Sequence, residues 1–202
     1  IPRKLLKFRE FMDCITEGVK SMVGAMIILT LAWTIGGITK EDYLNTGGFV
    51  AHQLSSNNIP IWIFPAIIFV VAAFLAFSTG TAWGTFGILI PIIVPIIVKM
   101  DAMSHISIIL ASIFSGSVFG DHCSPISDTT ILSSAGANCH HIDHVSSQLP
   151  YAFISAGASF VGFLVGGYFN NVVVAWISAL AIFFVLIYVA KIRTYAKINA
   201  KA

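Results

Sequence analysis

Long apolar runs alternate with short polar stretches along the chain, and their lengths predict membrane-spanning helices. A helix needs about 20 mostly apolar residues to cross a bilayer, with about 17 as the lower limit. The pattern predicts six crossings, over residues 22–38, 60–77, 78–98, a broken helix at 104–138, 150–169 and 172–190. Residues 1–20 are amphipathic and predict a surface helix or connecting segment.

Two of these segments are expected to contain breaks. As one straight helix, residues 60–98 would reach about 58 Å, about twice the hydrocarbon thickness, so the chain must turn back at Ser78–Thr85. Pro91 and Pro95 are expected to interrupt the arm that follows. The second break is expected at Asp121–Ser124, with Ser124 as N-cap and Pro125 as the first residue of a helix lasting to about residue 137.

Composition makes lipid the expected solvent for most of the chain. Hydrophobic residues make up 57% of the 202 residues and charged residues only 10%, whereas soluble domains carry about 25% charged residues. The mean hydropathy is +0.89. The net charge of +2 gives no indication of nucleic-acid binding, and three cysteines without framework spacing give no support for disulfides. The fold class is therefore an all-α polytopic integral membrane protein with about six membrane segments and discontinuous helices.

Basic residues gather at the two ends of the chain. Four lie before the first apolar run (Arg3, Lys4, Lys7 and Arg9) and four after the last (Lys191, Arg193, Lys197 and Lys201). Positive charge beside a span marks the cytoplasmic side. Both termini are therefore expected in the cytoplasm, together with residues 139–149, which form a polar loop in this topology.

The chemistry is concentrated in the second break. Asp121 and Asp128 stand among the hydroxyls of Ser124, Ser127, Thr129 and Thr130, between apolar spans. Ionisable residues at membrane depth are costly and usually serve a site or pathway. Carboxylates, hydroxyls and unpaired helix-end carbonyls suit a small hard cation, so Na+ at Asp121 and Asp128 is the candidate metal, in competition with a proton. The alternative is structural: Asp128 satisfies helix amides and Asp121 caps a turn.

Residues around the first break are candidates for the same site. Thr79 and Thr81 are candidate neutral ligands for the cation, while Trp83 and Thr85 are candidates for lining the pathway. His122 is a candidate for tuning proton affinity. The structural alternative is that these hydroxyls repair the helix break and that His122 bonds to its backbone.

Two further patterns have alternative interpretations. His140 and His144 have the four-residue spacing of a helical zinc pair, but a pH-responsive or ordinary solvated loop fits the stretch as well. Ala158, Gly162 and Gly166 form a small-residue ridge that predicts close helix packing.

Two motifs resemble one family of transporters. Gly80–Thr85 and Phe119–Thr130, followed by His141–His144 and Gln148–Tyr151, are similar to the NhaC-type sodium/proton antiporters over residues 11–190. The resemblance implies an inner-membrane exchanger of Na+ for H+, built from two related halves. Because this chain carries one copy of the acidic motif, we expect residues 1–202 to be a single transporter domain, the C-terminal half of a longer chain.

The resemblance also sets the expected partners. They are Na+ or Li+, H+, the lipid bilayer and the N-terminal half, with self-association left open. No cofactor, enzymatic activity or nucleic acid is expected. Some relatives in the superfamily exchange metabolites such as malate and lactate, so coupled metabolite antiport is the main alternative. A remote one, an intramembrane aspartyl protease, lacks support because Val118 stands where the Gly-x-Gly-Asp motif needs glycine and no Tyr-Asp pair exists.

Overall fold

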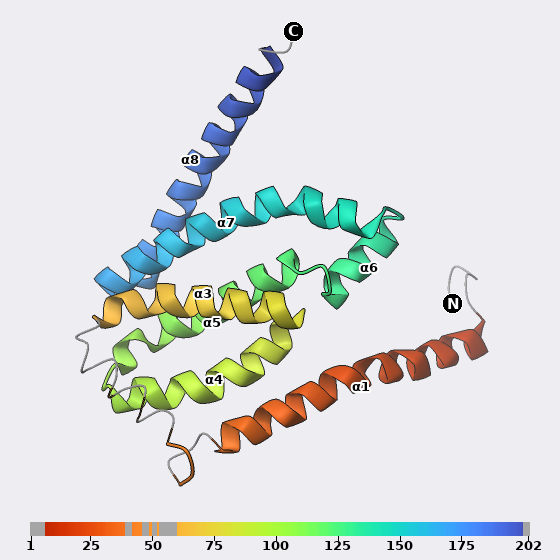
Figure 1. Ribbon diagram of the computed structural model, residues 1–202, viewed down its shortest axis with the longest axis horizontal. Coiled ribbons are helices and arrows are strands. Elements are labelled where there is room, and N and C mark those ends of the chain that lie inside the picture. The colour runs from red at the N-terminus through yellow and green to blue at the C-terminus, as the bar shows by residue number, and fades with distance from the viewer. Residues whose placement is uncertain (1–6, 39–41, 46–48, 50–51, 53–59, 200–202) are drawn as a thin grey trace.

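All regular secondary structure in the described part of the chain is helical. The computed structural model describes residues 7–38, 42–45, 49, 52 and 60–199, and contains no strand within them. Its helices are α1 (Phe8–Ile38), α3 (Phe64–Thr79), α4 (Ala82–Lys99), α5 (Ile106–Cys123), α6 (Asp128–Gly136), α7 (His141–Phe169) and α8 (Val172–Asn199) (Figure 1). Short 3-10 turns at Ile61–Ile63 and Met103–His105 lead into α3 and α5.

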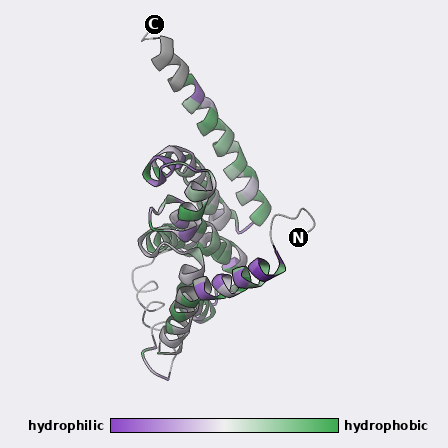
Figure 2. Ribbon diagram, turned by 90° about the vertical axis from the view of Figure 1, so that its right-hand side faces the viewer, coloured by the Kyte–Doolittle hydropathy of each residue, from purple (hydrophilic) through white to green (hydrophobic). Residues whose placement is uncertain are grey.

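Five of the described segments are long and apolar enough to cross a membrane. They are Ile61–Thr79, Ala82–Lys99, Met103–Cys123, His141–Phe169 and Val172–Ile192. The span in α8 has none of its residues buried within the chain, and Figure 2 shows this helix as mainly hydrophobic along its described length. A helix that is both apolar and uncovered needs lipid or another apolar surface around it. The length and composition of these helices support the predicted membrane fold, while six crossings remain a prediction.

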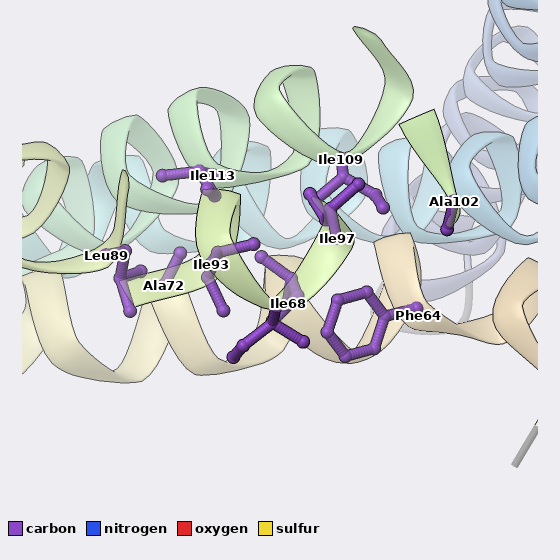
Figure 3. Packing of buried hydrophobic residues seen from close by; sticks show 10 residues of the cluster. Phe64, Ile68, Ala72, Leu89, Ile93, Ile97, Ala102, Ile109 and Ile113 are labelled. Carbon is purple, nitrogen blue, oxygen red and sulfur yellow. The ribbon is translucent and has the colours of Figure 1, made fainter. Parts of the chain in front are cut away.

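The core lies between α3, α4 and α5. Figure 3 shows side chains from the three helices directed toward one another, with Phe64, Ile68 and Ala72 on α3 facing a cluster of other buried residues. That cluster comprises Leu89, Ile93, Ile96 and Ile97 from α4, Ala102 before α5, and Ile109 and Ile113 from α5. The three helices therefore pack as one unit, in which α4 runs back from the end of α3 to the start of α5.

Two glycines bring the backbones of α3 and α5 into contact. A Cβ atom on Gly116 would lie 2.3 Å from the Phe69 carbonyl oxygen, and one on Gly120 would lie 2.1 Å from that of Ala73. Because the contacts advance along both helices together, α3 and α5 run parallel. Both helices therefore end at the same end of the bundle (Figure 1).

The hairpin of α7 and α8 is packed through the predicted ridge of small residues. Gly162 and Gly166 lie against Ala179 and Ala175 of α8, where an added Cβ would come within 2.8 Å and 2.5 Å of the alanine methyl groups. Asn170 turns the chain in a left-handed conformation with φ of 47°. The side chain of Asn171 then accepts hydrogen bonds from the amides of Val173 and Val174, which starts α8.

Apart from the second break, three expectations about the helices are wrong. The chain has one helix over Phe8–Ile38 in place of a separate surface helix or connecting segment at residues 1–20. The second arm of the hairpin is also uninterrupted, because α4 continues through Pro91 and Pro95. Both prolines remove hydrogen bonds from the helix, but their neighbours on α4 contribute four side chains to the core, and packing overrides the local preference.

The third correction concerns residues 139–149. They are not a polar loop up to Pro150, because α7 begins at His141 and has Pro150 in its interior. The first turns of α7 are retained by tertiary contacts: Val145 is buried, and both His141 and Gln148 make hydrogen bonds with the end of α5 or the segment after it. A single-sequence pattern contains no signal for such contacts.

The contact between α3 and α5 generates a stability prediction. We expect Gly120→Ala to destabilise the protein by about 1–3 kcal/mol, because the methyl group must push the two backbones apart. Gly157→Ala is the matched control in a membrane helix, since its Cβ would meet only Leu186 Cδ1 at 3.7 Å. Thermal unfolding of the full-length protein in detergent measures both. Equal melting temperatures for the two variants would contradict the close contact.

Candidate cation and proton site

The first break separates α3 from α4 and lies where it was predicted. Helix α3 ends at Thr79, and Gly80 follows in the left-handed conformation with φ of 68°. Thr81 is extended, and its hydroxyl oxygen accepts a hydrogen bond from the amide of Gly84, which caps α4. Glycine suits this turn because residues with a Cβ rarely adopt positive φ.

The second break separates α5 from α6, but α6 begins later than predicted. Helix α5 ends at Cys123, and Ser124 is its extended C-cap; the N-cap of α6 is Ser127 and its first residue is Asp128. Ser124 and Pro125 therefore do not start α6. The reason is local: the Ser124 hydroxyl accepts a hydrogen bond from the Ile126 amide, and this tight turn delays the next helix by three residues.

The two breaks touch each other. A Cβ on Gly80 would lie 2.9 Å from both the carbonyl oxygen and the Cγ1 atom of Ile126, so the first break packs directly on the second. This contact follows from the parallel course of α3 and α5, whose ends lie side by side in Figure 1. Position 80 therefore requires glycine for two reasons: its backbone has a positive φ, and a side chain there would collide with Ile126.

The candidate hydroxyls of the first break make local hydrogen bonds. Thr79 donates to the carbonyl of Leu75, and Thr85, which is fully buried, donates to that of Thr81. Thr81 accepts from the Gly84 amide. Trp83 is exposed and stacks edge-on against Phe86. These contacts stabilise the break, and among the described hydrogen bonds none joins the hydroxyls of Thr79, Thr81 or Thr85 to Asp121.

Asp121 is the centre of the polar cluster at the second break. Asp121 is only 4% exposed. Its carboxylate accepts two hydrogen bonds. Ser127 Oγ donates to Oδ1 at 2.8 Å, and Thr129 Oγ1 donates to Oδ2 at 2.8 Å. The two hydroxyl oxygens also lie 2.7 Å from each other. The carboxylate and the hydroxyls therefore close a ring of four oxygen atoms.

The number of protons in this ring limits what it can bind. The ring has three oxygen-to-oxygen contacts, but Ser127 and Thr129 supply only two hydroxyl protons. When the carboxylate of Asp121 is ionised, one contact therefore lacks a proton. A third proton on the carboxyl group gives each contact one donor, and a cation bound to the oxygens would also relieve their repulsion. The ring is thus a chemical site for one proton or one small cation.

The other candidates surround this ring without forming part of it. Ser124 and Thr130 are buried and lie within three residues of Ser127 in the chain. Asp128 is exposed, and its Oδ1 accepts a hydrogen bond from the Thr129 amide at the start of α6. His122 is also exposed, and its Nδ1 lies 3.0 Å from the carbonyl oxygen of Val118. The two predicted carboxylates therefore occupy different environments, one enclosed and one open.

The carbonyls at the end of α5 are largely engaged within the chain. The Ser124 amide donates to the carbonyls of both Gly120 and Asp121, and the Gln148 side chain donates to that of His122. Beyond the break, His141 Nε2 donates to the Pro125 carbonyl. The printed donors to the Asp121 carboxylate are the side-chain hydroxyls of Ser127 and Thr129.

Sequence reasoning missed the contributions of His141 and Gln148. Both residues lie in stretches that carry the family resemblance, but neither was a candidate for the site, and the zinc spacing pointed to His140 and His144 instead. His140 is exposed beside Asp143. In the described part of the chain, no three His, Cys, Asp or Glu side chains gather as a metal site. The available signal was the four- and seven-residue spacing of Val145 and Gln148 from His141, which places the three on one helix face.

Comparisons with known proteins place these observations in a family. A family model described as the Na+/H+ antiporter family matches residues 3–168. An uncharacterised protein of Haemophilus influenzae is 45% identical over 87% of this chain and 33% of its own length. An uncharacterised Na+/H+ antiporter of the same organism is 26% identical, over 82% of this chain and 35% of its own. No solved structure matches.

A third relative has a different printed activity. The malate-2H+/Na+-lactate antiporter of Bacillus subtilis is 25% identical over 79% of this chain and 34% of its own length. The chain therefore spans about a third of the length of the curated relatives it matches.

The ring predicts a measurable effect of one buried hydroxyl. Ser127→Ala removes a donor to Asp121 and leaves the carboxylate under-bonded, so we expect a loss of about 1–3 kcal/mol in the free energy of unfolding. The N-cap position itself contributes little, because the Ser127 side chain makes no capping hydrogen bond. Chemical unfolding of the full-length protein provides the measurement. Ser133→Ala, an exposed serine on the same helix, should stay within about 0.5 kcal/mol of wild type; an equal loss in both variants would contradict the ring.

Proposed function

Because the chain belongs to the Na+/H+ antiporter family, we propose that it forms part of a transporter that exchanges Na+ for H+ at Asp121. The observation that carries the proposal is the ring of Asp121, Ser127 and Thr129, which lacks one proton when the carboxylate is ionised. A proton and a cation therefore compete for one place. Competition at a single carboxylate couples the two ions, since one must leave before the other binds.

Sodium fits the chemistry of this place. The ring offers a carboxylate and two hydroxyl oxygens, which are hard ligands of the kind small hard cations prefer. Ser124 and Thr130, both buried, are proposed to complete the shell as the break adjusts. Thr79 and Thr81 contribute indirectly, by shaping the turn against which Ile126 packs.

Asp128 is proposed as an outer carboxylate. It is exposed at the first turn of α6, one residue from Thr129. From there it attracts cations and retains its local bond to the Thr129 amide. His122, Trp83 and Thr85 are proposed to lie along the pathway, with His122 adjacent to Asp121 in the chain.

Metabolite exchange is the second candidate, because one relative is a malate-2H+/Na+-lactate antiporter. Binding of an organic carboxylate usually requires a cationic side chain. Lys99 is the only Lys or Arg between Lys40 and Lys191. It lies at the C-terminal end of α4, the end opposite the break, where its Nζ contacts Asn45 Oδ1 at 2.8 Å. Within this chain, the charge distribution therefore favours exchange of inorganic cations.

The wider setting is proposed on the same basis. The transporter is of the NhaC type, the chain is the second of two related halves, and both termini lie on the cytoplasmic side of the cell membrane. The basic residues at both ends support the orientation. The chain covers only about a third of the length of these relatives, which supports the proposal that the transporter needs further segments.

The test is Na+-driven pH change in vesicles that contain the full-length protein. We expect Asp121→Asn to abolish exchange, because asparagine keeps the size but removes the charge that balances Na+, at a cost of a few kcal/mol or at least about a hundredfold in affinity. Asp128→Asn should retain exchange with a weaker apparent Na+ affinity. Asp143→Asn, an exposed acid on α7, is the control.

Two outcomes would contradict the proposal. Wild-type exchange in Asp121→Asn at normal protein level would exclude the ring as the ion site. Transport that requires malate or lactate, with no pH change from Na+ alone, would replace Na+/H+ exchange with metabolite antiport.

A further inference from the structure

We infer that one face of α7, formed by His141, Val145 and Gln148, positions the ion site by holding the break between α5 and α6 in place. The inference rests on the proposed function and adds two positioning residues, His141 and Gln148, to it. Neither touches the carboxylate of Asp121. They act on the backbone that carries Ser127 and Thr129.

The imidazole of His141 bridges the break and α6. Its Nε2 lies 2.7 Å from the carbonyl oxygen of Pro125, within the turn of the break. Its Nδ1 lies 3.0 Å from Ser134 Oγ on α6, and Ser134 is itself buried. A single side chain therefore fixes the distance between the turn and the helix whose first residues face Asp121.

Gln148 holds the other side of the break. Its Nε2 donates to the carbonyl of His122, the residue that follows Asp121 at the end of α5. Val145 is buried on the same face, between the two polar side chains. The face therefore contacts both α5 and the turn, and links the two parts of the chain that the ring must join.

Such a support is required because the turn between α5 and α6 has few hydrogen bonds of its own to fix its position. Ser124–Ser127 is not helical, and its own backbone bonds run from the Ser124 amide to the end of α5 and from the Ser127 amide to Ser124 at 3.3 Å. The ring also connects α6 to α5, but its hydrogen bonds change whenever a cation replaces the proton or a proton replaces the cation. The face of α7 supplies contacts that do not depend on the occupant of the ring.

The bonds of His141 require a proton count of their own. Ser134 Oγ already donates to the Ile131 carbonyl at 2.8 Å, and the Pro125 carbonyl can only accept. Both ring nitrogens must therefore donate for all these bonds to exist together, which is the charged form of histidine. A neutral ring keeps both contacts only if the Ser134 hydroxyl turns away from Ile131.

A glutamine at position 141 tests this hydrogen bonding without the imidazole, because its side chain can donate to one partner and accept from the other.

The experiment compares His141→Ala, His141→Gln and Gln148→Ala in the full-length protein, with His140→Ala as an exposed control. Each variant is assayed for half-saturating Na+ in exchange and for the rise in melting temperature that Na+ produces. We expect His141→Ala and Gln148→Ala to raise half-saturating Na+ about tenfold, the typical effect of losing a hydrogen bond of this kind, with a smaller change in maximal rate. His141→Gln should restore most of the affinity.

The rise in melting temperature produced by Na+ gives the second readout. It should be smaller in His141→Ala and Gln148→Ala than in wild type, and it should recover in His141→Gln. Wild-type Na+ affinity in His141→Ala, or equal effects of His141→Ala and His140→Ala, would overturn the inference while leaving the proposed function intact. Normal exchange in Asp121→Asn would instead overturn the proposed function.

Discussion

The backbone contact between α3 and α5 is the constraint on which the site depends. Gly116 and Gly120 allow the carbonyls of Phe69 and Ala73 to occupy the space that side chains would otherwise fill. The two helices consequently run parallel, and both stop at the same level. Without this contact, Gly80 would not lie against Ile126, and the turn before Ser127 would lose the surface on which it rests.

A buried carboxylate follows from that arrangement. Asp121 is one residue after Gly120, so the close approach of the helices also encloses its side chain. An enclosed carboxylate requires partners, and Ser127 and Thr129 provide them from the far side of the break. The chain is thus held together at the break by bonds to the group proposed to bind the transported ions, so occupancy of that group bears directly on local structure.

The helical and apolar character of the chain could be predicted from the length of its apolar runs. The break at Gly80 was predicted in place, whereas the break expected at Asp121–Ser124 begins only after Cys123, where α5 ends. The small-residue ridge in α7 was likewise predictable from the four-residue spacing of Ala158, Gly162 and Gly166, and both glycines pack closely against α8.

The boundaries that failed are those decided by tertiary contacts. Pro91 and Pro95 signal an interruption, yet the packing of Leu89 and Ile93 in the core retains the helix. Residues 141–149 are polar enough for a loop, but three of them contact or pack near the end of α5, and these contacts are invisible in a local pattern. The burial of Asp121 and the exposure of Asp128 were also beyond sequence reasoning, because spacing alone does not reveal which carboxylate the helices enclose.

The most direct test of the account is the protonation state of Asp121 when Na+ binds. Infrared difference spectra of the full-length protein, recorded with and without Na+ at constant pH, report the carbonyl stretch of protonated carboxylic acids. The account predicts that Na+ removes such a band in the wild type and in Asp128→Asn, and that the change is absent in Asp121→Asn. A band that disappears equally in Asp121→Asn, or no change in the wild type under conditions where Na+ is bound, would contradict competition between Na+ and H+ at this carboxylate.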